Sequence, residues 1–356
     1  MGVKVFVVDD SAVVRQTLAH LLAGNAEIEL IGSAPNPLLA LDMIRKNPPD
    51  VLLLDIEMPG MDGLTFLRQI MASTPIPTVI CSTLSTEGSA VALEALAAGA
   101  VAVLAKPKLG LKQFLDDSRR ELIQTLKTAA KSRPKGRVVA SAPLVKPVNL
   151  AASSRAPAMG GVHALAMNKP IVIGSSTGGT QAIETVLTQL PADAPGIAIT
   201  QHMPEKFTAM YSKRLDGLCA INVREACDGD RLERGVALIA PGGLHMQLRK
   251  NAGQYYVKIV DGPPVNRHKP SVDVLFRSTA ECAGQDALAI IMTGMGDDGA
   301  RGMKVLHDGG ARTIAQNEET CVVFGMPKEA IKLQAVDEIL PLEHIARAIL
   351  QFDSRA

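Results

Sequence analysis

The sequence contains two stretches in which predicted strands alternate with predicted helices, separated by one interruption. This pattern restricts the chain to a small number of fold classes. Short apolar runs alternate with amphipathic stretches over residues 1–130, and the alternation resumes at Lys169. Between them, residues 131–168 hold four prolines and six Lys or Arg but no Asp or Glu. Such a composition buries no core and predicts a basic, semi-extended linker. The 356 residues are therefore expected to form two α/β domains.

Composition argues against several classes of protein. The net charge of +1 gives no strong basic field, so we expect no nucleic-acid partner. The chain enters an apolar strand at once, and no run approaches the roughly 20 apolar residues of a membrane span. We therefore expect a cytoplasmic protein without direct membrane insertion. The five cysteines form no CxxC pair, which is typical of single thiols in a reducing compartment.

The first half is expected to contain five strand–helix units. The predicted strands cover residues 3–8, 28–33, 51–54, 77–82 and 101–104, and the predicted helices cover 11–23, 37–46, 63–72, 88–98 and 110–130. Five such units in a row predict a doubly wound parallel sheet. In a flavodoxin-like strand order, 2-1-3-4-5, the loops that follow the strands open on one carboxyl edge.

Polar side chains gather at that edge. Asp9 and Asp10 end the first strand and Asp55 ends the third. Keeping three neighbouring carboxylates ionised costs free energy because their charges repel, unless a cation lies between them. Carboxylate oxygens are hard ligands, which Mg²⁺ prefers. A carboxylate beside Mg²⁺ can act as a nucleophile toward phosphorus, and Lys106 and Ser82 are placed to neutralise the added phosphoryl oxygens. Alternatively, each acidic residue simply caps a strand end or a helix start.

Together these segments resemble the receiver domain of bacterial response regulators. The resemblance covers residues 1–125 and rests on Val8-Asp9-Asp10-Ser11, Leu54-Asp55-Ile-Glu-Met-Pro-Gly-Met-Asp-Gly63, Ser82-Thr83 and Lys106-Pro107. It implies that Asp55 accepts a phosphoryl group. It also implies that Mg²⁺ is held by Asp9, Asp10, Asp55 and the backbone carbonyl of Glu57.

The same resemblance implies a switch. Ser82 would be the switch hydroxyl and Lys106 the phosphate partner, with a cis bond between Lys106 and Pro107. Many receivers carry an aromatic residue shortly before this lysine, but residues 101–105 hold none. We therefore expect a signal to travel by packing other than an aromatic rotamer.

The second half is expected to form a separate, doubly wound, mostly parallel α/β domain. The predicted strands cover residues 170–174, 196–200, 236–240, 287–292, 311–315 and 336–340, and the predicted helices cover 179–190, 204–216, 271–283, 299–308 and 342–352. Glycine-containing turns bracket a predicted hairpin of residues 244–248 and 255–260.

A glycine turn between the first strand and helix of this half holds a serine. Residues 174–178 fit the Gly-x-Ser-x-Gly pattern of a nucleophile elbow, with Ser176 at its centre. Thr180 is predicted to cap the following helix. Ser175 offers a second hydroxyl, one residue short of the turn apex. The alternative is a glycine-rich phosphate loop or a simple tight connection.

Two further polar segments follow predicted strands of this half. His202 comes at one strand end, and Asp297 and Asp298 lie in the glycine-rich loop 294–299 after another. In an open α/β sheet these loops share the carboxyl edge with Ser176, so nucleophile, base and acid meet there. As alternatives, the histidine caps a helix or lies in the core, and the glycine-rich loop binds a nucleotide phosphate.

Residues 169–352 resemble the catalytic domain of the CheB methylesterase family. The resemblance rests on Ile173-Gly-Ser-Ser-Thr-Gly-Gly179, Thr200-Gln-His-Met-Pro204, Ile239-Ala-Pro-Gly-Gly243, the segment 261–273, Thr293-Gly-Met-Gly-Asp-Asp-Gly299, Ala315-Gln-Asn317 and Phe324-Gly-Met-Pro327. It implies the triad Ser176, His202 and Asp298, with oxyanion stabilisation by Thr177 and the backbone amide of Met295.

The whole chain thus resembles a chemotaxis response regulator that hydrolyses glutamate methyl esters. The expected organisation is a receiver domain over residues 1–125, a helix end and basic linker over 126–168, and a methylesterase domain over 169–356. The resemblance implies methyl-accepting chemoreceptors as substrate, with glutamine deamidation as well, a chemotaxis histidine kinase as phosphodonor, and no cofactor in the catalytic half. A receiver-linked nucleotide-binding module and an esterase for another substrate remain the alternatives.

Overall fold

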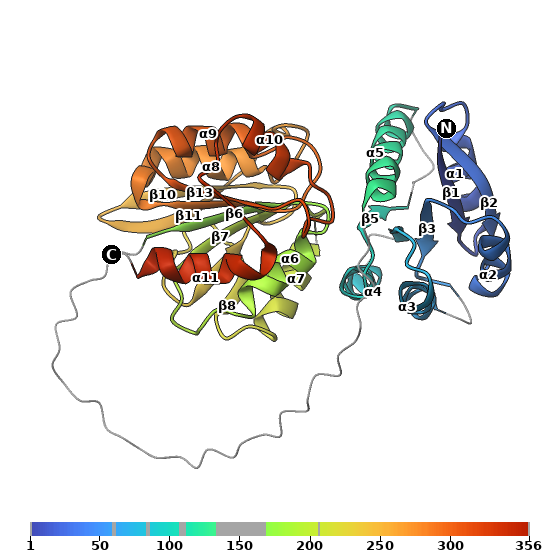
Figure 1. Ribbon diagram of the computed structural model, residues 1–356, viewed down its shortest axis with the longest axis horizontal. Helices are drawn as coiled ribbons and strands as arrows, with labels where there is room; N and C mark the ends of the chain where they lie inside the picture. The colour runs from blue at the N-terminus through green and yellow to red at the C-terminus, as the bar shows by residue number, and fades with distance from the viewer. Residues whose placement is uncertain are drawn as a thin grey trace, which may run out of the picture.

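The computed structural model describes residues 2–58, 62–82, 86–106, 112–132, 169–205 and 207–354. These residues form two α/β domains, each with helices on both faces of a parallel sheet (Figure 1). Most of the predicted linker, residues 133–168, lies outside the described residues, and so does Pro107 with its predicted cis bond. Among the described residues, none of the helices combines the length and hydrophobicity that crossing a bilayer requires.

The first domain is built on a five-stranded parallel sheet in the order β2-β1-β3-β4-β5, which confirms the flavodoxin-like prediction. Its elements are β1 (Val3–Val8), α1 (Ala12–Leu22), β2 (Ile28–Ala34), α2 (Pro37–Lys46), β3 (Val51–Asp55), α3 (Gly63–Ser73), β4 (Thr78–Ser82), α4 (Thr86–Ala97), β5 (Ala102–Ala105) and α5 (Lys112–Lys131). All five residues of β3 are buried, as expected for a central strand covered on both faces, and Asp55 ends it.

The second domain is built on a seven-stranded parallel sheet in the order β14-β13-β12-β6-β7-β9-β8, with a separate antiparallel hairpin of β10 and β11. Its elements are β6 (Ile171–Ser175), α6 (Gly179–Leu187), β7 (Ile197–Gln201), α7 (Phe207–Asp216), β8 (Asn222–Glu225), β9 (Val236–Ile239), β10 (His245–Asn251), β11 (Gln254–Val260), α8 (Val272–Cys282), the 3₁₀ turn Gly284–Asp286, β12 (Leu288–Ile291), α9 (Ala300–Asp308), β13 (Arg312–Gln316), α10 (Met326–Lys332), β14 (Glu338–Leu340) and α11 (Leu342–Asp353).

Strand β6 lies at the topological switch point of the seven-stranded sheet. The chain leaves β6 toward β7 on one side, whereas β12 pairs with β6 on the other side. This is the point at which the strand order reverses, and open α/β sheets bind ligands outside the carboxyl ends of the strands there. The loops that follow β6, β7 and β12 therefore meet at one edge.

Three local predictions are wrong or incomplete. Thr180 does not cap α6, because the helix begins at Gly179 and the cap is Gly178, which makes no side-chain hydrogen bond. Strand β8 was not predicted, because it is an edge strand that buries only one of its four residues. Helix α10 was not predicted either, since it is seven residues long and opens on Met326-Pro327.

The two domains touch along the helices of the first domain that follow β4 and β5. Helix α4 packs against α6 and α7. Gln181 on α6 donates its amide N–H to the carbonyl of Leu96 in the last turn of α4. On α5, Nε2 of Gln124 lies 3.7 Å from Sδ of Met295, and the Thr128 hydroxyl contacts the same sulfur. The first domain therefore reaches the loop after β12.

Candidate functional sites

Ser176 forms the turn between β6 and α6. Its N–H donates to the carbonyl of Thr293 at 3.0 Å, and its carbonyl accepts from Nε2 of Gln201 at 2.8 Å. The turn requires glycine at position 178, because φ there is 79° and an added Cβ would lie 2.5 Å from the side chain of Val322. A tight strand-to-helix turn of this kind has the geometry predicted for a nucleophile elbow.

The two adjacent serines have different surroundings. Ser175 is buried, and its hydroxyl donates to Oε1 of Gln201 at 2.7 Å. Ser176 is partly exposed at the end of the strand. Of the two hydroxyls, that of Ser176 is therefore the one an external reactant can reach.

His202 and Asp298 form a hydrogen-bonded pair beside this turn. Nε2 of His202 lies 2.8 Å from Oδ2 of Asp298, and both side chains are largely withdrawn from solvent. Burial acts to raise the pKa of Asp298, but the hydrogen bond and charge of His202 outweigh it and lower the pKa well below its ordinary value. Because an ionised carboxylate only accepts, the hydrogen of this bond lies on Nε2 of His202, and in the neutral form of the ring Nδ1 then keeps a lone pair.

Asp298 is held by several donors besides the histidine. Its Oδ1 accepts from the Ser271 hydroxyl at 2.7 Å and from Nδ2 of Asn266 at 2.9 Å, and its Oδ2 accepts from the N–H of Val272 at 2.7 Å. These bonds further favour the ionised form. Asp297 lacks this setting, since it is partly exposed beside the pair.

Nδ1 of His202 is buried and has no hydrogen-bond partner in the part of the chain that the structure describes. Consequently no hydrogen bond joins it to Ser176. The backbone of His202 is bonded to the residue before Ser176, because the N–H of His202 donates to the carbonyl of Ser175 at 3.1 Å. Catalytic hydrogen bonds are often long or absent before a substrate binds, so this geometry suits a base awaiting its nucleophile.

The predicted oxyanion residues flank the same turn. The carbonyl of Thr177 accepts from the Thr293 hydroxyl at 2.9 Å, which ties the turn to the loop after β12. Met295 lies on that loop. The N–H of Met326 donates to the carbonyl of Gly294 at 2.9 Å and so holds the loop in place. Within the described residues, the N–H groups of Thr177 and Met295 donate to no other group. Both are thus available as donors to a ligand.

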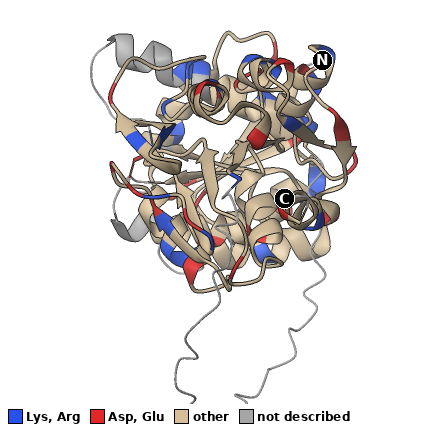
Figure 2. Cartoon of the chain, turned by 90° about the vertical axis from the view of Figure 1, so that its left-hand side faces the viewer, with Lys and Arg blue, Asp and Glu red and all other residues tan. Residues whose placement is uncertain are grey.

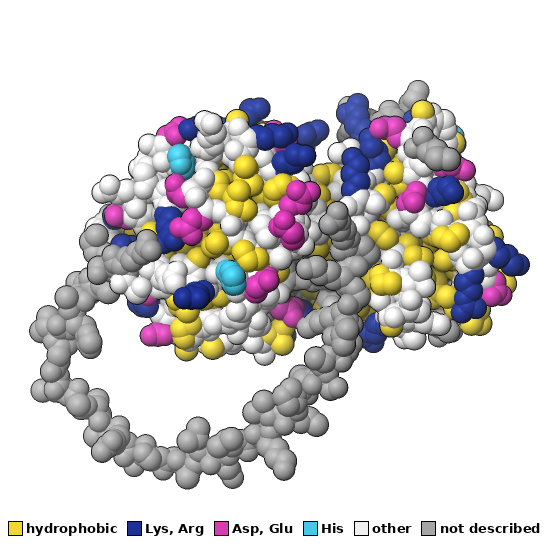
Figure 3. Space-filling view, in the orientation of Figure 1, with side chains coloured by type: hydrophobic (Ala, Val, Ile, Leu, Met, Phe, Trp, Pro, Cys, Tyr) yellow, Lys and Arg dark blue, Asp and Glu magenta, His cyan; other side chains and the backbone are white. Residues whose placement is uncertain are grey.

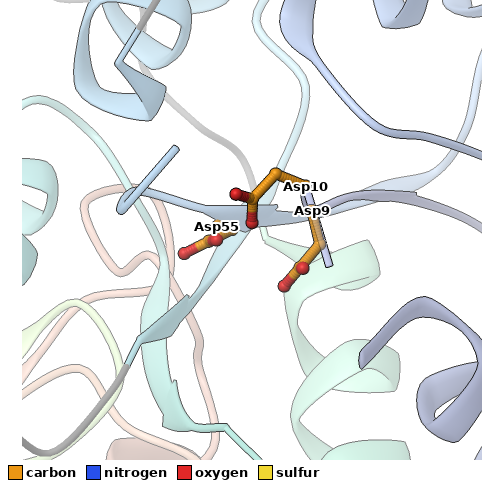
Figure 4. Close-up of side chains that lie close together, drawn as sticks. All are labelled: Asp9, Asp10 and Asp55. Atoms are coloured by element: carbon orange, nitrogen blue, oxygen red, sulfur yellow. The ribbon is translucent and has the colours of Figure 1, made fainter. Parts of the chain in front are cut away.

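A second polar cluster lies at the carboxyl edge of the first domain. Carboxylate oxygens of Asp9, Asp10 and Asp55 lie within 4.8 Å of one another (Figure 4). Nζ of Lys106 lies 2.7 Å from Oδ2 of Asp55 and 3.4 Å from Oδ2 of Asp9. Ser82 is buried at the end of the neighbouring strand β4. The structure brings these predicted residues together.

The electrostatics of this cluster favour a cation. Burial raises the pKa of Asp9, and the nearby charge of Asp55 adds to it, while Lys106 acts in the opposite direction. Burial acts to lower the pKa of Lys106, but its hydrogen bond to Asp55 and the negative charges of Asp55 and Asp9 together outweigh this and raise the pKa. Oδ2 of Asp9 is buried and, among the described residues, has only the long ion pair with Nζ of Lys106 at 3.4 Å and no hydrogen bond of normal geometry. A hard divalent cation would satisfy this oxygen, so the residues present fit Mg²⁺.

Sequence reasoning missed the residues that hold the acid and the turn. Asn266 and Ser271 belong to the segment 261–273, whose pattern was noted without a role for either residue. Gln201 was likewise not singled out, although its amide bridges both serines. The signal that could have identified them is that they are polar residues in loops, where no predicted strand or helix accounts for their presence.

Comparisons with known proteins agree with this architecture. The protein-family profile described as CheB methylesterase matches residues 171–349, and the profile described as response regulator receiver domain matches residues 5–115. The crystal structure of the Thermotoga maritima CheB methylesterase catalytic domain is 36% identical, with a TM-score of 0.51, and the match covers 52% of this chain and 98% of that one. Fold and site together define a receiver-linked methylesterase class.

The chain belongs to the family of protein-glutamate methylesterases/protein-glutamine glutaminases. It is 56% identical to protein-glutamate methylesterase/protein-glutamine glutaminase 2 of Dechloromonas aromatica (strain RCB), over 98% of both chains. It is also 56% identical to protein-glutamate methylesterase/protein-glutamine glutaminase 1 of Xanthomonas oryzae pv. oryzae (strain MAFF 311018), over 96% of this chain and 99% of that one.

Surface charge has no dominant sign on the faces in view. Lys and Arg are interspersed with Asp and Glu over both domains in Figures 2 and 3.

Proposed function

We propose that this protein removes methyl groups, in the cytoplasm, from glutamate methyl esters on methyl-accepting chemoreceptors. The observation that carries the proposal is the His202–Asp298 pair, which leaves Nδ1 of His202 buried beside the Ser176 turn, with no hydrogen-bond partner among the described residues. Membership of the methylesterase family supports the substrate class.

In the proposed mechanism Ser176 is the nucleophile and His202 is the base. Oγ of Ser176 bonds to the ester carbonyl carbon while its proton passes to Nδ1 of His202. The amides of Thr177 and Met295 stabilise the oxyanion, an effect of about 3 kcal/mol per donor in comparable sites. His202 returns the proton to the departing methoxide, which leaves as methanol. Water then adds to the acyl group, again giving its proton to Nδ1, and frees the glutamate.

The same steps act on a glutamine side chain. The leaving group is then ammonia in place of methanol, and the product is again glutamate. The buried carboxylate of Asp298 balances the charge that His202 acquires in each step. None of these steps requires a cofactor in this domain.

The first domain would receive its signal as a phosphoryl group on Asp55, supplied by a chemotaxis histidine kinase. Asp9, Asp10, Asp55 and the Glu57 backbone carbonyl would hold Mg²⁺, which supplies positive charge beside the phosphoryl oxygens when bound. Lys106 already reaches Oδ2 of Asp55 and would pair with the added oxygens. The Ser82 hydroxyl would close on them as the switch.

Contacts between the domains support restraint of the esterase by the unphosphorylated receiver. Thr128 and Gln124 on α5 touch Met295, the residue whose amide serves the oxyanion. Gln181 on α6, the helix that follows the nucleophile, is bonded to α4. Both α4 and α5 pack against β4, which ends at Ser82, and against β5, which ends at Ala105, the residue before Lys106. Phosphorylation is expected to loosen this docking and open the site.

Methanol release from a methylated receptor, with and without a small phosphodonor, tests the proposal. We expect slow release that the phosphodonor accelerates, together with stoichiometric labelling of Ser176 by a serine-directed phosphonate. Absence of both release and labelling would favour a receiver-linked binding module. Labelling without release from the receptor would favour an esterase for another substrate.

A further inference from the structure

The ring of His268 stacks on the ring of His202. The two ring centroids lie 3.8 Å apart and the planes deviate by 12° from parallel. His268 follows the hairpin of β10 and β11 and takes no part in the proton transfers set out above. Face-to-face contact with the base is therefore a feature that the triad alone does not explain.

A tight turn carries His268 to this place. The backbones of Val265 and His268 are joined by two hydrogen bonds, of 3.1 and 2.9 Å. The two central residues both have positive φ, 49° for Asn266 and 71° for Arg267. Positive φ at both positions is the signature of a type I′ turn, which usually employs glycine or asparagine. A left-handed arginine is strained, and such strain persists only where the surroundings enforce it.

The same turn also holds the acid. Nδ2 of Asn266 donates to Oδ1 of Asp298 at 2.9 Å and to Oδ2 of Asp273 at 2.7 Å. One four-residue turn thus contacts His202 through a ring face and Asp298 through an amide. Both ends of the 2.8 Å hydrogen bond between His202 and Asp298 are supported from one side.

We propose that His268 is a positioning residue that keeps the His202 ring in the plane where Nε2 meets Asp298 and Nδ1 is left for Ser176. The torsion about the Cβ–Cγ bond of histidine is soft, so an unsupported ring can twist or turn over. A parallel ring at 3.8 Å blocks that twist, because rotation would drive the edge of one ring into the face of the other. This inference rests on the proposed function, since it takes His202 as the base.

The protonation state of His268 suits this task. Burial lowers its pKa to about 4, with His202 and Arg267 acting in the same direction and Asp298 in the opposite one. His268 is therefore neutral near pH 7. A neutral ring tolerates the charge that His202 acquires in each step, whereas a charged ring would repel it.

A matched pair of substitutions in the full chain tests the stacking. His268→Phe keeps a flat ring without nitrogen atoms, and His268→Leu keeps an apolar side chain without a flat face. For methanol release from methylated receptor, we expect His268→Phe to stay within about 3-fold of wild type and His268→Leu to lose about 10- to 100-fold in kcat with KM nearly unchanged. Thermal denaturation of both variants checks that they fold.

A second comparison shows whether His268 acts through His202. In the His202→Ala background, His268→Leu should cause no further loss of the residual activity, because the ring that it supports is gone. An equal loss in both backgrounds would overturn the proposal, and so would a His268→Leu variant as active as His268→Phe, or a His268→Phe variant as poor as His268→Leu. Failure of the proposed function would instead appear in the wild-type chain, as no methanol release at all.

Discussion

Nε2 of His202 lies 2.8 Å from Oδ2 of Asp298, so the proposed base meets the proposed acid through the ring nitrogen farther from the main chain. The nitrogen left for the proposed nucleophile is Nδ1, which is buried and has no hydrogen-bond partner among the described residues. The backbone N–H of the same histidine is bonded to the carbonyl of Ser175. The backbone hydrogen bond to Ser175 and the side-chain hydrogen bond to Asp298 together orient the His202 ring. In the proposed mechanism this orientation directs the proton of Ser176 to Nδ1.

Asp298→Asn should lower methanol release by about 10⁴-fold, whereas Asp297→Asn should have little effect. An amide in place of Asp298 can stabilise the wrong tautomer of His202, which is the origin of the loss in comparable triads. Asp297 is the matched control because it is adjacent but not bonded to the histidine. Steady-state kinetics of the two variants decide the matter, and equal losses would reject Asp298 as the acid.

Asp55→Asn should abolish stimulation by a phosphodonor and leave the basal release of methanol intact. The two chemistries use separate residues on separate domains, so the basal reaction does not need the Asp55 carboxylate. Asp42→Asn, on the exposed face of α2, is the control that should respond like wild type. Radiolabel from acetyl phosphate on the Asp55→Asn variant would identify another acceptor.

Gln181→Glu should raise the basal activity of the unphosphorylated chain about 5-fold and shrink the stimulation by phosphodonor. A carboxylate facing the carbonyl of Leu96 leaves that carbonyl without its donor, at a cost of about 1 kcal/mol to docking. Gln189→Glu makes the same charge change at an exposed position and serves as the control. Unchanged basal activity in the Gln181→Glu variant would contradict restraint through this contact.

The stability of the chain should depend on pH through His268. In the unfolded chain this residue takes a proton near pH 6.5, but in the folded protein only near pH 4. Between these values the unfolded state binds more protons, so the free energy of unfolding falls as the pH is lowered. His268→Phe lacks this loss, and its melting temperature relative to wild type should rise from pH 7 to pH 5. A constant difference would show that His268 titrates alike in both states.

Much of the fold was predictable because parallel strands that are buried on both faces consist of consecutive apolar residues. Strands β3 and β6 are of this kind, and the glycine and acidic residues after them indicate the loops. Edge strand β8 carries no such run, since Asn222 and Glu225 are polar. Its position depends on pairing with β9, which no local pattern reveals.

The positions of the candidate site residues were predictable for a related reason. Ser176, His202 and Asp298 each follow a strand of one parallel sheet, so the carboxyl-edge rule brings them together. His268 follows a hairpin outside that sheet, and no edge rule places its ring on His202. The contact of α5 with Met295 joins two domains, and a pattern within either domain cannot predict it.

The central claim is that Ser176 attacks the ester, and the most direct measurement is methanol release from methylated receptor by Ser176→Ala and Ser175→Ala. The account predicts that Ser176→Ala falls at least about 10³-fold while its fold is unchanged. Ser175→Ala, which loses a buried hydrogen bond to Gln201, should keep substantial activity. Wild-type release by Ser176→Ala, with Ser175→Ala inactive, would contradict the account.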